Sequence, residues 1–486
     1  MPKKSKFYVT TPIYYANARL HIGHAYTTII ADILARWHKM LGEDVFFLTG
    51  MDEHGKKIQE TAESSGKKPQ KFVDEIAENA KKLWKSLDIE YDNFIRTTDK
   101  EHVKEVQKVL QKFYDEKLIY KGKYEAYYCT GCEQYKTASE IEEGMCALHK
   151  RPVELRSEGA YLFRLSKFQK DLLSLIKKDK YRIQPIERKN EIMYFLEKNK
   201  LNDISISRPK SEVYWGIELP FDKEHTCYVW IDAFLNYLTG LKDKKYWPAD
   251  VQLMSKDIFR VHATIWPAML LALKKELPKQ LFIHGYFTIN GQKMSKSLGN
   301  VVDPFYVAEK YGSDVLKYFI IRHIPLGSDG DFSETALKDR HNNELANKLG
   351  NLVSRVSGMC KGIIPSGITD DSLASRLKLT EIMGHMNNIE LDRALAEIFA
   401  FIDKCNEYVQ QKEPWRLEGK EKDNALYNLA DSIRVISILI SSFMPQTSQK
   451  INEQFNFPKP DIKNLKFGLA KKGIINKADI LFAKIE

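Results

Sequence analysis

The N-terminal part of the chain alternates between two hydrophobic patterns. Residues 7–11 (Phe-Tyr-Val-Thr-Thr) are β-branched and aromatic and stop at Pro12, which is typical of a strand. Apolar side chains then recur at helical spacing over residues 24–41, and residues 44–49 (Asp-Val-Phe-Phe-Leu-Thr) again indicate a buried strand. A strand, a helix and a second strand form the βαβ unit of a parallel sheet, so the sequence predicts an α/β domain that begins here.

A short motif, His21-Ile22-Gly23-His24, falls at the N-terminus of this predicted helix. Backbone N–H groups and the helix dipole favour an anion at that position. Gly23 has no side chain, so a ligand can approach the backbone closely. Taken alone, the two histidines are better explained as caps of a helix, because motifs this short often match by chance.

A second motif lies far along the chain, in the glycine-flanked loop at residues 291–300 (Gly-Gln-Lys-Met-Ser-Lys-Ser-Leu-Gly-Asn). Lys293 and Lys296 place two ammonium groups three residues apart, with hydroxyl side chains between and after them. Such groups suit the oxygens of a triphosphate. A lysine and serine loop on its own is more often solvated surface.

The two motifs, in this order, resemble the signatures of the class I aminoacyl-tRNA synthetases, and the chain as a whole is similar to the methionyl-tRNA synthetases. Further matching segments are residues 11–17, 50–55, 230–233, 266–270, 329–333 and 349–353. The resemblance implies an α/β fold: a Rossmann-type parallel-sheet catalytic domain, split by a zinc-knuckle insertion and followed by an all-α anticodon-binding helical bundle.

The resemblance also implies a division into five segments. They are residues 5–119 (first half of the catalytic domain), 120–225 (connective insertion), 226–324 (second half), 325–345 (stem-contact segment with linker) and 346–486 (anticodon-binding domain). Within the second half the apolar pattern predicts a strand at 227–231, a strand–helix unit over 258–273 and a strand at 280–284.

Length and charge agree with this interpretation. A chain of 486 residues holds two to four domains. Lys and Arg outnumber Asp and Glu by 75 to 65, which suits a phosphate-rich partner such as tRNA, although the lysines are spread along the whole chain. The sequence shows no apolar run near bilayer length and no segment appended to the family core, so we expect a cytoplasmic monomer.

Three of the six cysteines lie close together. Cys129, Cys132 and Cys146 are followed by His149, in the pattern Cys-x2-Cys, thirteen residues, Cys-x2-His. Three thiolates and one imidazole complete the tetrahedral shell of a structural zinc ion. The alternative is a reduced cysteine pair beside unrelated residues. The resemblance supports one Zn2+, because related synthetases carry such a knuckle in the insertion.

The implied reaction is the activation of L-methionine with ATP to methionyl-adenylate, followed by transfer to the 3′-terminal ribose of initiator and elongator tRNA(Met). The resemblance assigns catalysis to His21, His24, Lys293 and Lys296. The ATP-binding residues it implies, with Mg2+ on the phosphates, are His21, Gly23, His24, Lys293, Ser295, Lys296 and Ser297.

The positions that match the family's methionine pocket are Ile13, Tyr15, Asp52, Trp230, Ala233, Tyr237, Ile258 and His262. Asp52 matches the residue that pairs with the substrate's α-ammonium group, while Tyr15 and His262 place polar groups near the thioether. Without the resemblance, the aromatic residues of this set would be interpreted as core.

The anticodon contacts are implied by two positions. Trp415, in Glu413-Pro414-Trp415, matches a tryptophan that stacks on an anticodon base, although tryptophan also packs between helices. Asp392 stands where an asparagine often reads a base edge, and Ala396 where an arginine often sits. An aspartate accepts but does not donate hydrogen bonds, so at least one base contact must differ.

Two other functions are alternatives to a methionyl-tRNA synthetase. Synthetases for valine or isoleucine carry a large editing insertion, and residues 120–225 are too few for one; single-domain adenylyltransferases share a two-histidine box but not the knuckle or the bundle. A non-catalytic paralogue that only binds tRNA would show loss of the motif histidines or lysines, and all four are present.

Overall fold

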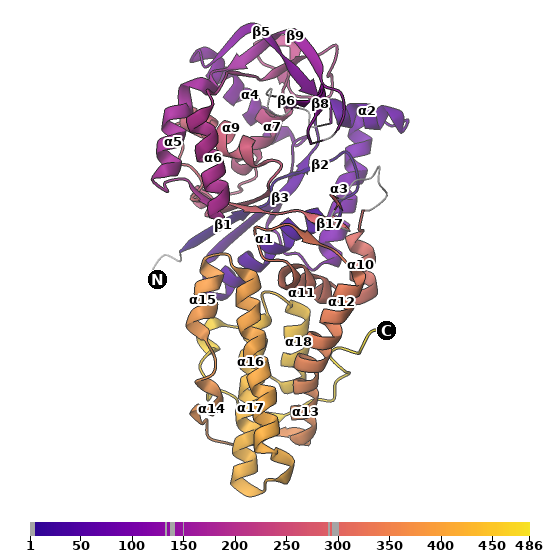
Figure 1. Ribbon diagram of the computed structural model, residues 1–486, viewed down its shortest axis with the longest axis vertical. Helices are drawn as coiled ribbons and strands as arrows, with labels where there is room; N and C mark the ends of the chain where they lie inside the picture. Colours follow the sequence, from indigo (N-terminus) through magenta and orange to yellow (C-terminus); the bar gives the residue numbers. More distant parts are fainter. Residues whose placement is uncertain (1–4, 132–133, 137–140, 149, 290–291, 294–300) are drawn as a thin grey trace.

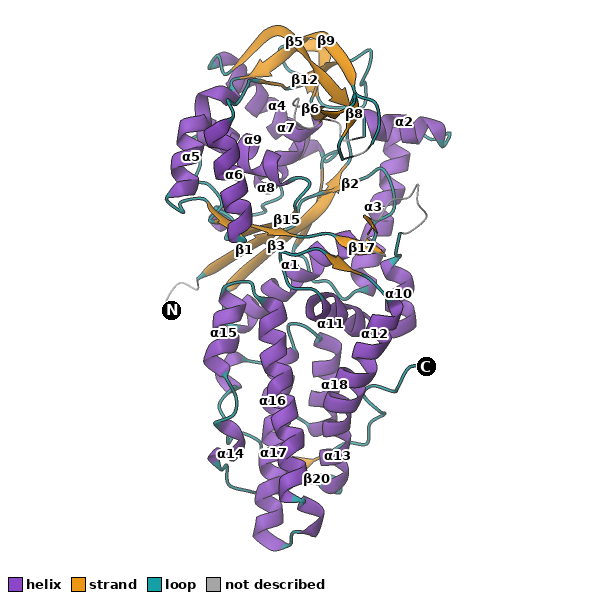
Figure 2. Ribbon diagram, viewed as in Figure 1, coloured by secondary structure: helices purple, strands orange, loops and turns teal. Residues whose placement is uncertain are grey.

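The structure is a computed structural model that describes residues 5–131, 134–136, 141–148, 150–289, 292–293 and 301–486. An α/β part and a helical part are stacked end to end (Figure 1). Figure 2 shows the strands gathered in the upper part and a lower part made almost entirely of helices. The predicted order of a sheet domain followed by a helical bundle is confirmed.

The central sheet of the α/β part has seven strands, all paired in parallel. In spatial order they are β10 (Arg182–Gln184), β16 (Gln280–His284), β15 (Val251–Ser255), β1 (Lys6–Thr10), β3 (Asp44–Asp52) and β2 (Tyr14–Tyr15), with β4 (Asn93–Arg96) also paired to β3. Strands β3, β2 and β4 extend the sheet to one side of β1, and strands β15, β16 and β10 extend it to the other. Strand order therefore reverses at β1, which is where ligands bind in open α/β sheets.

The predicted βαβ unit is confirmed by β1, α1 (Ile22–Met40) and β3. Val9 of β1 pairs with Phe47 of β3, and both side chains are fully buried. Residues 25–35 of the helix are all buried, so its middle is covered on every side and not only along one apolar stripe. The unit places the N-terminus of α1 beside the carboxyl ends of the central strands.

The predicted insertion contributes to two structures. Its long hairpin, β5 (Ile119–Cys129) and β9 (Glu154–Phe163), belongs to a separate antiparallel sheet. Strand β10, however, lies within residues 120–225 and pairs with β16 in the central sheet. A three-residue strand of Arg-Ile-Gln shows no alternation that a sequence pattern can detect, so this return to the sheet was not predicted.

One predicted strand is wrong. Strand β14 (Asp222–Cys227) ends where the prediction began, and the helix α7 (Val229–Phe234) follows it. Most residues of α7 are buried, so its apolar run lacks the one-sided pattern of a surface helix. The strand predicted at 280–284 is confirmed as β16, and the helix of the strand–helix unit is α9 (Phe259–Ala272).

A small three-stranded sheet joins the second ATP motif to the segment that leads into the bundle. Strand β17 (Phe287–Ile289) pairs antiparallel with β18 (Gln292–Lys293) and parallel with β19 (Gly330–Asp331). Strand β19 belongs to the predicted stem-contact segment. The backbone at Lys293 is therefore connected to that segment through a single intervening strand.

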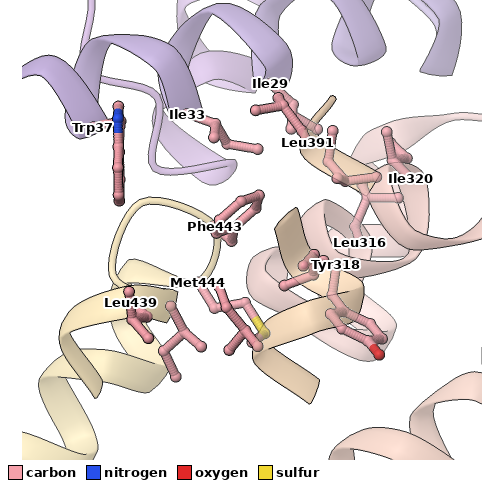
Figure 3. Packing of buried hydrophobic residues seen from close by; sticks show 14 of the residues in the cluster. Ile29, Ile33, Trp37, Leu316, Tyr318, Ile320, Leu391, Leu439, Phe443 and Met444 are labelled. Atoms are coloured by element: carbon pink, nitrogen blue, oxygen red, sulfur yellow. The ribbon is translucent and has the colours of Figure 1, made fainter. Parts of the chain in front are cut away.

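The bundle includes α11 (Ser313–His323), α13 (Asn351–Met359), α16 (Leu391–Lys412), α17 (Gly419–Ile440) and α18 (Pro445–Phe455). It packs directly against α1, which lies between the sheet and the bundle in Figure 1. The residues that meet there are Ile29, Ile33, Trp37, Leu316, Ile320, Leu391, Phe443 and Met444 (Figure 3). One apolar core thus continues from the sheet into the bundle.

A charged pair lies inside the same junction. Lys317 Nζ of α11 lies 3.1 Å from Asp32 Oδ2 of α1, and both residues are fully buried. Burial alone would raise the pKa of Asp32, but Lys317 and Arg36 hold it below its usual range.

Within the described ranges, none of the helices combines the length and apolar character needed to cross a lipid bilayer.

Candidate active site

A cavity of about 310 Å³ opens at the carboxyl ends of the central strands, beside the point where strand order reverses. Its walls come from the loop after β1, the start of α1, the end of β3, helices α7 and α9, and the turn after β16. The residues predicted for methionine all line it: Ile13, Tyr15, Asp52, Trp230, Ala233, Tyr237, Ile258 and His262. His21, Gly23 and His24 line the same cavity.

The two histidines of the first motif cap α1. The Gly23 N–H donates to His21 Nδ1 at 3.1 Å, and the His21 N–H donates to His24 Nδ1 at 3.0 Å. A neutral imidazole that accepts at Nδ1 carries its proton on Nε2. Capping and ligand binding are therefore compatible, because each ring retains an N–H donor suited to a phosphate oxygen.

Hydroxyl groups from the next turn attach the start of α1 to neighbouring strands. Thr28 Oγ1 lies 2.6 Å from the hydroxyl oxygen of Tyr14, and Thr27 Oγ1 lies 2.6 Å from His284 Nε2. His284 Nδ1–H donates to the carbonyl of Gly285, and burial lowers the pKa of His284 to about 4. The ring is neutral at physiological pH, so Thr27 is the donor to Nε2.

His284 and Tyr286 also line the cavity and were not predicted from the sequence. The signal was available, because residues at the carboxyl end of a predicted parallel strand are expected to face the ligand site.

The apolar end of the cavity is built around His262. Its Nδ1–H donates to the carbonyl of Ile258 at 2.9 Å, and its Nε2 accepts from the hydroxyl of Tyr237 at 2.8 Å. Burial lowers the pKa of His262 to about 4, so the ring is neutral. His262 thus bonds Tyr237 through one ring nitrogen and the backbone of Ile258 through the other.

Aromatic rings complete this wall. The ring of Phe234 lies 5.5 Å from that of Trp230 and 4.9 Å, edge to face, from that of His262. Both Phe234 and Trp230 line the cavity. Polarisable aromatic walls of this kind suit an unbranched side chain that carries a sulfur atom.

Several predicted site residues lie outside the described residues. They are Ser295, Lys296 and Ser297 of the second ATP motif, and Cys132 and His149 of the zinc pattern. The backbone of Lys293 is described, in β18, but its side chain is not.

The other two cysteines of the zinc pattern are described. Cys129 ends β5 and Cys146 lies in β8 (Met145–Cys146); both are buried and neither forms a disulfide. Gly131, between the first two cysteines, lines the cavity. The residues that the structure describes contain no cluster of three or more metal-ligating side chains.

The predicted anticodon residues lie at opposite ends of one helix. Trp415 follows the end of α16 in a short turn and is 47% exposed, with the Arg355 guanidinium 5.7 Å from its ring centre. Asp392 is the second residue of α16, about 30 Å away at 1.5 Å per residue. Burial raises the pKa of Asp392, and its carboxylate accepts from the backbone of Leu326 near the sheet. The two positions are thus far apart, and Arg355 of α13 is a side chain beside the tryptophan.

Comparison with known proteins identifies the family. The family described as "tRNA synthetases class I (M)" matches residues 7–146 and 136–357. The chain belongs to the methionyl-tRNA synthetase family. A second family, the "Anticodon binding domain of methionyl tRNA ligase", matches residues 366–486.

Relatives of this family align along the whole chain. The methionine–tRNA ligase of Caldanaerobacter subterraneus subsp. tengcongensis is 46% identical, over 99% of this chain and 79% of the relative. That of Thermotoga maritima is 42% identical, over 99% and 80%. The Mycobacterium tuberculosis methionyl-tRNA synthetase in complex with methionyl-adenylate superposes with a TM-score of 0.93, at 33% identity over 98% of this chain and 99% of the other. The apo form of that enzyme gives 0.86, at 30% identity over 99% of each chain.

Proposed function

We propose that this chain activates L-methionine with ATP and transfers it to the 3′-terminal ribose of tRNA(Met). The observation that carries the proposal is the cavity, which brings the motif at the start of α1 and the aromatic pocket of the other half of the chain into one space. The methionyl-tRNA synthetase relatives and the neighbour that binds methionyl-adenylate support both steps.

In the first step a carboxylate oxygen of methionine attacks the α-phosphorus of ATP. The new P–O bond forms as the bond to the bridging oxygen breaks, and pyrophosphate leaves with that electron pair. The carboxylate is already a nucleophile, so the step requires no general base. Its barrier lies in the charge that builds on the phosphate oxygens, which positioned donors and cations stabilise.

His21 and His24 supply N–H donors at the N-terminus of α1, where the helix dipole already favours an anion. Lys293 and Lys296 bind the departing pyrophosphate, with the hydroxyls of Ser295 and Ser297 beside them. Mg2+, when bound with ATP, neutralises part of the triphosphate charge. The lysine loop is worth most if it tightens at the transition state, since such contacts raise kcat.

Asp52 fixes the amino acid by pairing with its α-ammonium group, and Trp230, Ala233 and Tyr237 enclose the side chain.

In the second step, a ribose hydroxyl of the tRNA attacks the activated carbonyl and AMP leaves. Trp415 and Arg355 form an exposed aromatic and cationic pair suited to an unpaired base of the tRNA.

The chain divides into the first half of the catalytic domain, the connective insertion, the second half, the stem-contact segment and the anticodon-binding domain. Residues 182–184, although within the insertion, belong with the catalytic sheet. The enzyme acts as a cytoplasmic monomer and charges both initiator and elongator tRNA(Met).

Trp415→Ala is expected to lower kcat/KM for tRNA charging about tenfold to a hundredfold, because one stacked base is lost. Methionine-dependent ATP–pyrophosphate exchange should be unchanged, since the residue lies at the far end of the bundle. Trp415→Phe, which retains a stacking ring, is the matched control. Equal loss in both assays would show that Trp415 supports the fold instead.

One structural Zn2+ held by Cys129, Cys132, Cys146 and His149 is the second expectation to test. The two described cysteines fit this role, because both are buried, reduced thiols in the same knuckle region. Metal analysis of the purified chain should find about one zinc per molecule, and Cys146→Ser should lose it and melt at a lower temperature. Cys405→Ser changes a buried cysteine of the bundle and should retain the metal. A wild-type chain with no zinc and intact thiols would contradict the assignment.

The function itself is tested by amino-acid-dependent ATP–pyrophosphate exchange with methionine, valine, isoleucine, leucine and cysteine. Exchange with methionine alone, abolished by Lys296→Ala, is the expected result. A folded, zinc-loaded chain that exchanges with none of them, even with tRNA added, would leave only a tRNA-binding role.

A further inference from the structure

Behind the cavity wall, one carboxylate accepts hydrogen bonds from two histidines. Asp232 Oδ2 lies 2.7 Å from His54 Nδ1, and Asp232 Oδ1 lies 2.7 Å from His102 Nε2. The exposed fractions of Asp232, His54 and His102 are 1%, 7% and 1%. His102 Nδ1 continues the network to Thr239 Oγ1 at 2.7 Å. The cluster joins three segments that are far apart in the sequence: the loop after β3, helix α4 (Lys100–Asp115) and the neighbouring helices α7 and α8 (Asn236–Thr239).

His54 and Asp232 are close in the sequence to residues of the methionine pocket. His54 follows Asp52 by two positions in the loop after β3, and Asp232 stands between Trp230 and Ala233 on α7. The bond between Asp232 and His54 therefore links two parts of the cavity wall, the one that carries Asp52 and the one that carries Trp230.

Helix α7 needs such an anchor. It has six residues, and no described side chain caps its N-terminus. Helices this short are not stable by themselves and take their position from tertiary contacts. Most of its other side chains are apolar and give no directional bond, so Asp232 is the residue of α7 that can fix its position against the β3 loop.

The electrostatics hold the carboxylate ionised. Burial alone would raise the pKa of Asp232, but His54 and His102 hold it below its usual range. A carboxylate accepts from two donors at once, whereas an amide in its place has only one acceptor oxygen. Its role therefore depends on the charged form and not only on the shape of the side chain.

We propose that Asp232, clamped between His54 and His102, is a positioning residue that sets the width of the methionine pocket. It acts through Asp52 and Trp230 and does not touch the substrate. The inference rests on the proposed function, because it concerns the affinity of that site for its amino acid.

Asp232→Asn tests the proposal in the full-length chain. One histidine N–H would then face the amide NH2, so the two walls are expected to separate, and calorimetry should show a Kd for methionine raised about tenfold. In pyrophosphate exchange the KM for methionine should rise with it, whereas the KM for ATP should not change, because the start of α1 is attached through Tyr14 and His284 instead. A loss of general stability would not separate the two substrates in this way.

Asp431→Asn is the matched control. Asp431 is also a fully buried carboxylate, bonded to Arg434 and to two backbone N–H groups inside the bundle, far from the cavity. It should lower thermal stability and leave the Kd for methionine unchanged. His102→Gln, which retains the bond between Asp232 and His54, should raise that Kd in the same direction by less, and it decides the question if Asp232→Asn does not fold.

A folded Asp232→Asn chain that binds methionine as wild type does, or that loses affinity for ATP and methionine equally, overturns the proposal while the function stands. A wild-type chain that neither binds methionine nor supports exchange overturns the proposed function, and this inference with it.

Discussion

His24→Ala is expected to slow methionine-dependent ATP–pyrophosphate exchange about a hundredfold to a thousandfold, with little change in the KM for methionine. The His24 ring accepts the His21 N–H at Nδ1 and carries its proton on Nε2 at the helix end where the phosphates bind. Alanine removes this donor from the site where negative charge develops. It also leaves the His21 N–H without its side-chain acceptor, so the first turn of α1 is less well fixed.

The control for this variant is His38→Ala. His38 occupies the last turn of the same helix, stacked on Phe7 and 2.5 Å from a Glu43 oxygen, away from the cavity. Both variants remove one imidazole from α1, and only His24→Ala should lose rate in single-turnover adenylate formation. Similar losses in the two variants would indicate that the defect lies in the helix and not in the chemistry.

Asp52→Asn is expected to raise the KM for methionine about tenfold to a hundredfold, because a charge-assisted bond to the α-ammonium becomes a neutral one. Asp52 is the last residue of β3 and lines the cavity, so the substitution changes charge at the site while retaining the shape of the side chain. Calorimetry with methionine gives the same comparison without turnover.

An analogue that lacks the α-amino group, 4-(methylthio)butanoate, sharpens this test. It should bind wild type and Asp52→Asn equally weakly, since neither can use the missing ammonium. Asp74→Asn changes an exposed carboxylate bonded to Arg96 and serves as the control. If the variant distinguished the two ligands as wild type does, the ammonium partner would have to be another residue.

The parts of the fold that the sequence predicted well are those whose apolar residues form a pattern over a few neighbouring positions. The βαβ unit and β16 follow from apolar runs and apolar spacing that lie within a few neighbouring residues. Helix α7 was predicted as a strand because it is buried on nearly every side and is shorter than two turns. Strand β10 is too short to show any pattern and is recognised only from its pairing with β16.

The site shows the same division. The residues of the cavity wall stand within recognisable motifs, so resemblance placed them, although their roles remain proposals. The bonds between them could not be predicted in this way. His54, His102 and Asp232 come from three distant segments, and nothing in their local sequence indicates that they meet. The separation of Asp392 and Trp415 by the length of α16 was likewise not predicted, because the length of that helix is fixed only in the structure.

The apolar core between α1 and the bundle has a consequence for how the molecule measures its tRNA. A tethered bundle would let the decoding end and the catalytic end adjust their separation. Here Trp37 and Ile33 of α1 and Phe443 and Met444, which follow α17, share one apolar core (Figure 3). This core holds the bundle in a fixed position relative to the α/β part. With the anticodon role proposed for Trp415, the distance from that residue to the cavity is set by the length of α16, and a tRNA whose two ends are separated by that distance would reach both sites.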